Sequence, residues 1–198
     1  KTRIIDEEDP APTIHLISRL VEAGAAAVTL HGRIMAKVYS GDVKFNIISE
    51  VRRNVRTQLI ANGGIFSHST CRVLRESSGC GCVMVARGAM GNPWIFEEIN
   101  AGEAFCPPTP ESLAEEIFRH VSEMAGIYGE EMGMKISRKL MIDYVKGRGY
   151  PGELKNSVCK IKTLEEMKPF LEDVKRGPTP RYRKWLETNP DSPRRLSV

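Results

Sequence analysis

The sequence predicts an α/β fold, a partial (β/α)8 TIM barrel of about four βα units followed by a small all-helical domain. Three observations predict it. Short apolar runs alternate with amphipathic helical segments over residues 1–100, as in successive βα units. These runs are continuous rather than alternating, which is typical of parallel strands buried on both faces. From residue 111 onward only helical periodicity is present. An open four-stranded sheet is the alternative to half of a barrel.

Four strand–helix pairs follow one another in the first part of the chain. In the first helix Ile14, Ile17 and Leu20 recur on one face, and Gly24 ends it. Pro93 is compatible with the first turn of the fourth helix. The expected strands are 2–5, 26–31, 58–61 and 81–86, and the expected helices are 13–23, 44–55, 69–77 and 93–99.

The remainder of the chain is expected to be helical after a proline-containing linker. Thr163 and Glu166 form a capping-box pattern that opens a helix, and Pro169 should kink or shorten that helix. Tyr182 and Trp185 are the residues able to dock the final segment. The expected parts are a linker at 101–110, a helical domain at 111–176 with helices 112–128, 134–146 and 154–160 before the one at 163, and a basic flexible tail at 177–198.

Composition limits the classes of function. The 198 residues carry 29 basic and 25 acidic side chains, and this net charge of +4 permits a polyanionic partner without requiring one. No run approaches the roughly 18 apolar residues of a membrane span, and no secretory signal is visible. The five cysteines are odd in number, so we expect reduced thiols in a cytoplasmic protein. Cys80 and Cys82 lack a second pair of matching spacing, and no metal is expected.

Cations, an amide and glycines follow the predicted strands. In parallel α/β folds the residues just beyond the strand C-termini form the site. Glycine frees the backbone N–H groups that cradle an anion, so the segments 62–64 and 86–88 are expected to hold a phosphate between them. The strand ends carry Lys1 with Arg3, His31-Gly32-Arg33, Asn62-Gly63-Gly64, and Arg87-Gly88 with Asn92.

Each of these residues also has an ordinary structural interpretation. Asn62-Gly63 is a hairpin signal, although the next strand lies beyond a helix. Gly63-Gly64 can simply start a helix, His31 can be a structural histidine, and Arg87 can belong to a surface ion pair. Only their joint placement at strand ends predicts a site.

Several segments resemble the second half of the tRNA-dihydrouridine synthase barrel. They are, in order, "KTR", "VTLHGR", "IANGGI" and "VMVARGAMGNPWIF". The later segment "IYGEEMGMKISRKLMIDYVKG" resembles the helical domain of that family, most closely its bacterial B-type branch. The resemblance covers about residues 1–175. It implies an FMN-binding TIM barrel that reduces uridine in tRNA to 5,6-dihydrouridine, with NADPH as the electron donor.

The resemblance also implies roles for individual residues. Lys1 and His31 correspond to residues that contact the flavin, and a cation at Lys1 would stabilise the reduced, anionic ring. One phosphate loop corresponds to Asn62, Gly63 and Gly64, and a second to Ala86 and Arg87, where the family more often has glycine before the arginine. Arg33 and Asn92 are expected at the substrate rim. Arg138 and Lys139 are expected to contact tRNA phosphates, although Leu140 and Asp143 replace a usual histidine and tryptophan nearby.

The resemblance implies a general-acid cysteine in an Asn-x-Gly-Cys-Pro stretch, which does not occur among these residues. No catalytic residue is therefore assigned in this chain, and the cysteine is expected upstream of Lys1, as in a fragment that is weakly active or inactive alone. Two alternatives stay open. One is a non-catalytic RNA-binding remnant, and the other is a different FMN- or phosphate-binding barrel oxidoreductase. We expect a monomer that binds tRNA and neither membrane nor metal.

Overall fold

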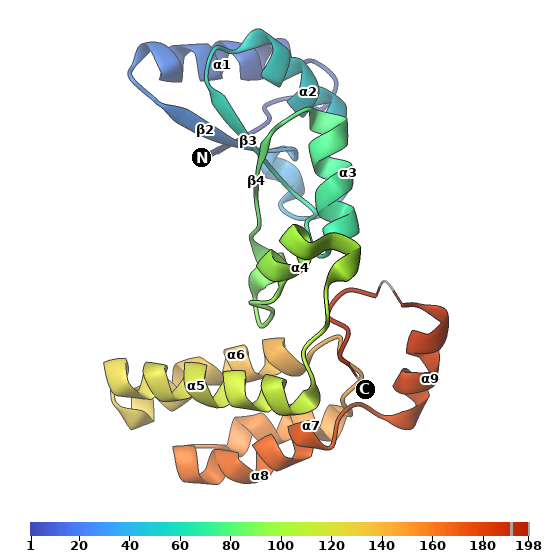
Figure 1. Ribbon diagram of the computed structural model, residues 1–198. Coiled ribbons are helices and arrows are strands. Elements are labelled where there is room, and N and C mark those ends of the chain that lie inside the picture. Colours follow the sequence, from blue (N-terminus) through green and yellow to red (C-terminus); the bar gives the residue numbers. More distant parts are fainter. Residues whose placement is uncertain (191, 198) are drawn as a thin grey trace. The chain divides into compact units, whose positions relative to one another are not determined.

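The structure, a computed structural model, describes residues 1–190 and 192–197. The chain forms two compact units, Lys1–Gly88 and Ala89–Val198 (Figure 1). The predicted boundary lay after residue 100, so α4 (Ile95–Ala101) belongs to the second unit instead of the barrel part. Side-chain packing explains this, because Trp94, directly before α4, packs against the core of the helical unit.

The first unit contains a parallel four-stranded sheet in the order β1 (Thr2–Arg3), β2 (Ala27–His31), β3 (Gln58–Asn62) and β4 (Cys82–Met84). Sequential strands are neighbours, and each pair is parallel. This arrangement requires a crossover after every strand, as in successive βα units. The predicted partial barrel with a following helical domain is confirmed.

Three helices connect these strands and lie on one side of the sheet (Figure 1). They are α1 (Ala11–Glu22), α2 (Phe45–Asn54) and α3 (His68–Ser78), with a short 3-10 helix η1 (Met35–Lys37) before α2. Each helix buries an apolar stripe, exemplified by Ile17, Ile48 and Leu74, which are fully buried. Burial of these stripes against the sheet is the main force that holds the unit together.

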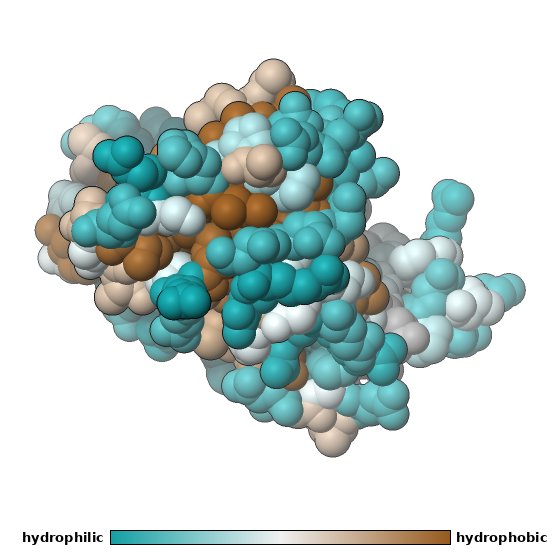
Figure 2. Space-filling view, turned by 90° about the horizontal axis from the view of Figure 1, so that it is seen from above, coloured by the Kyte–Doolittle hydropathy of each residue, from teal (hydrophilic) through white to brown (hydrophobic). Residues whose placement is uncertain are grey.

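The prediction that the strands are buried on both faces is only partly correct. Val28 and Leu30 are buried, whereas Thr29 between them is half-buried, and β4 has no fully buried residue. Helices cover one face of the sheet in the described chain, so alternate strand residues are less enclosed. Figure 2 views the chain from above and shows hydrophobic residues near the middle of the view, surrounded by hydrophilic ones.

The second unit is helical in the residues described. Its core joins α5, α6, α7 and α8, with Leu113, Met141, Leu154 and Phe170 among its buried members. Gly129, at φ +77°, connects α5 to α6. The bounds are α5 (Pro110–Tyr128), α6 (Glu130–Val145), α7 (Gly152–Ser157), α8 (Leu164–Lys175) and α9 (Pro180–Thr188), with 3-10 helices η2 (Arg87–Ala89), η3 (Gly102–Ala104) and η4 (Val158–Lys160).

Two expectations for the helical region need correction. Pro169 does not shorten α8, which continues to Lys175, and the alternative that it kinks the helix stays a prediction. The N-cap is as predicted, with Thr163 Oγ1 accepting from the Glu166 N–H at 3.2 Å. The segment expected to be a flexible tail contains α9, and its Tyr182 hydroxyl donates to the Gly147 carbonyl at 2.9 Å. The prolines at 178 and 180 therefore precede and begin a helix, since proline is tolerated in a first helical turn.

Three further observations concern the described residues as a whole. None of their helices combines the length and apolar character that crossing a bilayer requires. Nor do three His, Cys, Asp or Glu side chains gather there as a metal site would need. Cys71, Cys80, Cys82, Cys106 and Cys159 are all free thiols.

Candidate functional site

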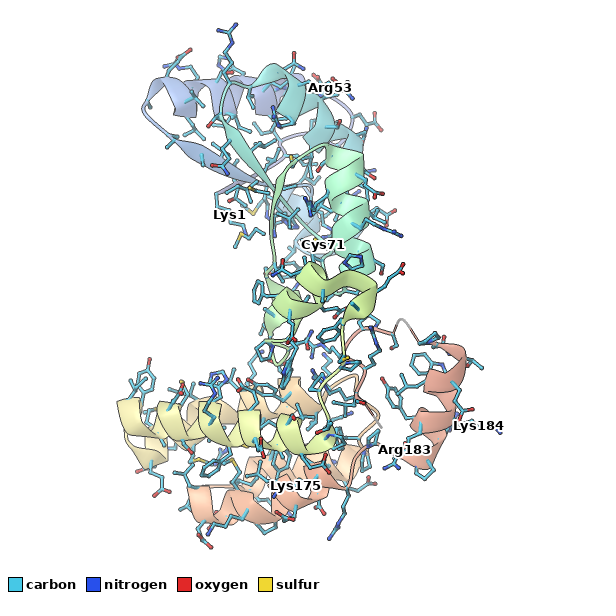
Figure 3. The ribbon with its side chains drawn as sticks, in the orientation of Figure 1. Lys1, Arg53, Cys71, Lys175, Arg183 and Lys184 are labelled. Carbon is cyan, nitrogen blue, oxygen red and sulfur yellow. The ribbon has the colours of Figure 1, made fainter. Side chains whose placement is uncertain are left out.

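A cavity of about 570 Å³ lies in the first unit, at the C-terminal edge of its sheet. Parallel strands end at the same edge, so residues that follow different strands meet there. Figure 3 shows Lys1 beside the strands, on the side away from α3. The seven residues predicted to bind a cofactor all line this cavity: Lys1, His31, Asn62, Gly63, Gly64, Ala86 and Arg87.

The strand register places one row of side chains across this edge. Arg3 pairs with His31, His31 with Asn62, and Asn62 with Met84. The Asn62 amide nitrogen donates to the Met84 carbonyl at 2.7 Å, which fixes the amide between β3 and β4. The Gly32 N–H donates to the Asn62 carbonyl at 3.1 Å. The floor of the cavity is therefore built from the sheet itself and is rigid.

His31 is neutral at physiological pH. Its pKa is lowered from 6.5 to about 4, chiefly by burial and then by the neighbouring charges of Arg3, Arg33, Lys1 and Arg87. Its Nε2 lies 3.4 Å from Nη1 of Arg33. Because a guanidinium can only donate, Nε2 is the acceptor and the ring proton is on Nδ1. His31 thus offers the cavity a neutral ring rather than a fourth cation.

The Asn62-Gly63-Gly64 segment requires glycine at its second position. Gly63 has φ +136°, and a Cβ there would lie 2.9 Å from Cγ2 of Val43 and 3.2 Å from Cδ2 of His31. Gly64 has φ +71°, but its Cβ would meet Val43 only at 3.5 Å. The segment is not a hairpin, because β3 and β4 are parallel and α3 lies between them in the chain. Any side chain at Gly63 would disturb both the turn and the wall of the cavity.

Two aromatic side chains hold Arg87 at the cavity. Its guanidinium carbon lies 4.1 Å from the Tyr39 ring centroid and 5.7 Å from that of Phe66. Arg3 also approaches Tyr39, at 5.9 Å, and donates to the carbonyl of Val38 at 2.8 Å. Sequence reasoning missed Tyr39 and Phe66, since both lie in loops after strands. An aromatic residue in a loop that follows a strand is the feature of the sequence that could have predicted their place in the cavity wall.

The cavity is electropositive. Lys1, Arg3 and Arg87 line it, and no carboxylate is among the described residues that do so. Arg33 contacts the lining residue His31, and burial followed by the charges of Arg87 and Arg3 lowers the Arg33 pKa. Cations held this close repel one another, so a bound anion would relieve the repulsion. The chemistry of the lining favours a ligand with a negative group and an apolar body, because Ile4, Ile65 and Phe66 also line it.

Arg33 and Asn92 are placed differently from the prediction of a substrate rim. Arg33 is 9% exposed, and its Nε donates to the Gly41 carbonyl at 2.9 Å, so it braces the loop after β2. Asn92 is 3% exposed in the second unit, where its Oδ1 accepts from Arg148 at 2.9 Å. Tertiary contacts that the sequence pattern did not reveal thus occupy Nε of Arg33 and Oδ1 of Asn92, while Nδ2 of Asn92 is buried without a partner among the described residues.

The predicted tRNA-contacting pair lies on α6. Arg138 is half-buried and donates to the Ile161 carbonyl at 3.2 Å through Nη2. The Lys139 side chain is 68% exposed and forms an ion pair with Asp143 at 2.6 Å. The Asp143 side chain is 17% exposed, so only the lysine side of this pair is open to solvent.

The fold and this cavity define the class of protein as a parallel α/β barrel type with an electropositive cavity at the C-terminal ends of its strands. The family model for "Dihydrouridine synthase (Dus)" matches residues 1–177. A probable tRNA-dihydrouridine synthase of Mycobacterium leprae (strain TN) is 37% identical over 159 residues, covering 77% of this chain and 41% of that protein. The tRNA-dihydrouridine synthase B of Proteus vulgaris is 33% identical over 162 residues, covering 79% and 50%.

The chain belongs to the dihydrouridine synthase family, and its relatives include B-type bacterial members. A probable tRNA-dihydrouridine synthase of Rickettsia bellii (strain RML369-C) is 33% identical over 157 residues, covering 77% of this chain and 48% of that protein. The chain thus spans about half the length of the curated relatives it matches. The resemblance predicted from the sequence is confirmed at the level of the family.

Proposed function

We propose that this chain acts in a tRNA-dihydrouridine synthase, an oxidoreductase that reduces uridine in tRNA to 5,6-dihydrouridine using FMN and NADPH. The observation that carries the proposal is the convergence of all seven family-matched cofactor positions on one cavity. Membership of the family and the names of the relatives support the same activity.

The residues of the cavity fit FMN. The phosphate of FMN requires cations and accessible backbone N–H groups, and Arg87 with the Gly63-Gly64 and Ala86–Arg87 segments supplies them. The flavin ring requires an apolar wall with a few polar groups, and the cavity joins Ile65 and Met84 to His31 and Lys1. Space at Gly63 that a Cβ would fill supports close approach of a ligand to the backbone.

The chemistry that FMN supplies when bound is two-electron hydride transfer. In our proposal the chain's own residues bind and tune that group. The Lys1 ammonium lines the cavity and would favour negative charge on a flavin bound there. His31 stays neutral through its lowered pKa and can donate from Nδ1 without adding charge. Asn62, fixed by the Met84 carbonyl, keeps the phosphate turn in place.

We further propose that α6 contacts the RNA backbone. The Lys139 side chain is 68% exposed, so its ammonium can reach a phosphate as well as Asp143, whose side chain is 17% exposed. Arg138 donates to the Ile161 carbonyl through Nε and Nη2, and in our proposal its remaining donors contact a phosphate. Contacts of this type are independent of sequence and weaken as salt rises.

The test uses the natural protein that contains these residues. We expect the purified protein to retain FMN and, with NADPH, to convert uridines of an unmodified tRNA transcript to dihydrouridine, detected by mass spectrometry. Arg87→Ala should reduce the bound flavin, whereas Arg53→Ala, an exposed arginine of α2, should not. A colourless protein that leaves every uridine unchanged would refute the proposal. RNA binding by such a protein would support the alternative of a non-catalytic RNA-binding remnant.

A further inference from the structure

The helix α9 (Pro180–Thr188) presents an exposed face that the site described above does not include. Arg181, Lys184 and Trp185 are spaced i, i+3 and i+4, so they share one side of the helix. All three are exposed, and Trp185 is 45% exposed. Tyr182 and Leu186, which are next to Trp185 on the helix surface, are half-buried. Arg181, Lys184 and Trp185 together form a surface that we call the α9 face.

The aromatic part of the α9 face is held in place by the protein. Tyr182 and Trp185 are stacked, with ring centroids 5.4 Å apart and an angle of 29° between the rings. The Tyr182 hydroxyl donates to the Gly147 carbonyl, and its ring occupies the space that a Cβ of Gly149 would need. The Thr179 N–H donates to the Gly149 carbonyl at 3.1 Å. Trp185 therefore stacks on a fixed partner, and this fixation lowers the entropy cost of binding.

The charged part of the α9 face has no carboxylate partner within the described residues, since neither Arg181 nor Lys184 takes part in an ion pair there. Arg183 is different, because its guanidinium donates to the carbonyls of Pro178 and Arg176 at 3.0 Å each. Figure 3 shows Lys184 on the outer side of α9 and Arg183 on its inner side. The outer side is thus a basic surface with a tryptophan in it.

We propose that the α9 face binds unpaired nucleotides of RNA, with Trp185 stacking on a base and Arg181 and Lys184 contacting the adjacent phosphates. A single strand repeats a flat base and an anionic phosphate, and an aromatic ring flanked by cations complements that repeat. An acidic peptide would satisfy the cations but leave Trp185 exposed. The family model ends at residue 177, so this site lies outside the matched region. The proposal uses the proposed function only to name tRNA as the natural source of the nucleotides.

The test measures binding of a short single-stranded uridine oligonucleotide to the natural protein that contains these residues. Stacking on the indole should quench tryptophan fluorescence, and the quench should disappear in Trp185→Phe, while that variant keeps most of the affinity. Trp185→Ala should weaken binding roughly 10-fold, the effect typical of one stacked base. Arg181→Gln with Lys184→Gln should reduce the slope of log affinity against log salt by about 0.7 for each phosphate that the variant no longer neutralises.

Controls separate this proposal from a general charge effect and from the proposed function. Lys168→Gln on α8 removes a like charge elsewhere and should leave the affinity unchanged. Equal affinity of the protein for polyglutamate, or an unaltered oligonucleotide affinity in Trp185→Ala, would overturn the assignment of the α9 face. Flavin content and dihydrouridine formation are measured on the same preparations. A failure of the proposed function would abolish these two readouts without changing the Trp185-dependent quench.

Discussion

Replacement of Gly63 by alanine tests the cavity most directly. The new Cβ would lie 2.9 and 3.1 Å from the two Cγ atoms of Val43 and 3.2 Å from Cδ2 of His31. Such overpacking costs about 1–3 kcal/mol. The backbone at φ +136° adds about 1–3 kcal/mol for a residue with a side chain. We therefore expect Gly63→Ala to lower the free energy of unfolding by about 2–6 kcal/mol, and to weaken flavin retention in protein that still folds.

The assay combines urea denaturation with the visible absorbance of bound flavin. Gly79→Ala is the matched control, because Gly79 has φ +69° with no atom within 4 Å of an added Cβ and lies outside the cavity lining. Gly79→Ala should lower the free energy of unfolding by only about 1–2 kcal/mol and leave flavin binding unchanged. A double-mutant cycle with Val43→Ala separates the cost of the close contact from the cost of the backbone strain. The smaller side chain at position 43 relieves the contact but leaves the backbone of residue 63 unchanged.

Two results would refute this reasoning in different ways. If Gly63→Ala costs no more than Gly79→Ala, then neither the strain nor the contact acts as the geometry implies. If Gly63→Ala lowers stability but the variant still binds flavin fully under conditions where it is folded, the Asn62–Gly64 turn is structural and is not part of the cofactor site.

Two further predictions concern His31 and Arg148. The His31 pKa is near 4 in the folded state and 6.5 in the unfolded state, so the unfolded state takes up the proton first as the pH falls. The contribution of neutral His31 to the free energy of unfolding is therefore fully present above pH 6.5. It falls by up to about 3 kcal/mol as the pH drops towards 4. Urea titrations across this range should give a shallower loss for His31→Gln than for the exposed control His15→Gln, and equal slopes would exclude the assignment. Arg148 is fully buried and donates to the carbonyls of Gly91 and Tyr144 and to Oδ1 of Asn92, so Arg148→Ala should cost about 3–5 kcal/mol. The exposed control Arg176→Ala should change stability by less than about 1 kcal/mol, and a similarly small effect at Arg148 would contradict the role of these bonds.

The candidate site was largely predictable because it depends on a rule of topology. Parallel strands end at one edge, so reading which residues follow each strand was enough to bring His31, Asn62 and Arg87 together. Tyr39 and Phe66 were not predictable in this way. Loop residues reach the cavity through turns whose path depends on distant contacts, such as the Arg3 donation to the Val38 carbonyl.

Local sequence also determined most elements, since hydrophobic periodicity, capping residues and glycine stops act within a few residues. The helix that starts after Thr163 and the strand that ends at Asn62 follow from such signals. The expected early end of the helix at Pro169 and the expected flexible tail were wrong because packing within the second unit offsets a local penalty. An interior proline costs a helix about 3 kcal/mol, whereas each buried apolar side chain contributes about 1.5–3 kcal/mol, and α8 buries Met167, Phe170, Leu171 and Val174.

The sequence alone determined the class of fold, the order of the βα units and the residues at the strand ends, because each depends on short-range patterns. Only the tertiary structure decided which of the polar residues are free to bind a ligand. Arg33 and Asn92 look like binding residues in the sequence, yet their side chains already bond to Gly41 and Arg148. Arg148, the partner of Asn92 Oδ1, comes from a distant segment and cannot be read from the sequence around Asn92. Long-range contacts therefore decide which polar atoms stay available, and at Asn92 they leave only the buried Nδ2 without a partner among the described residues.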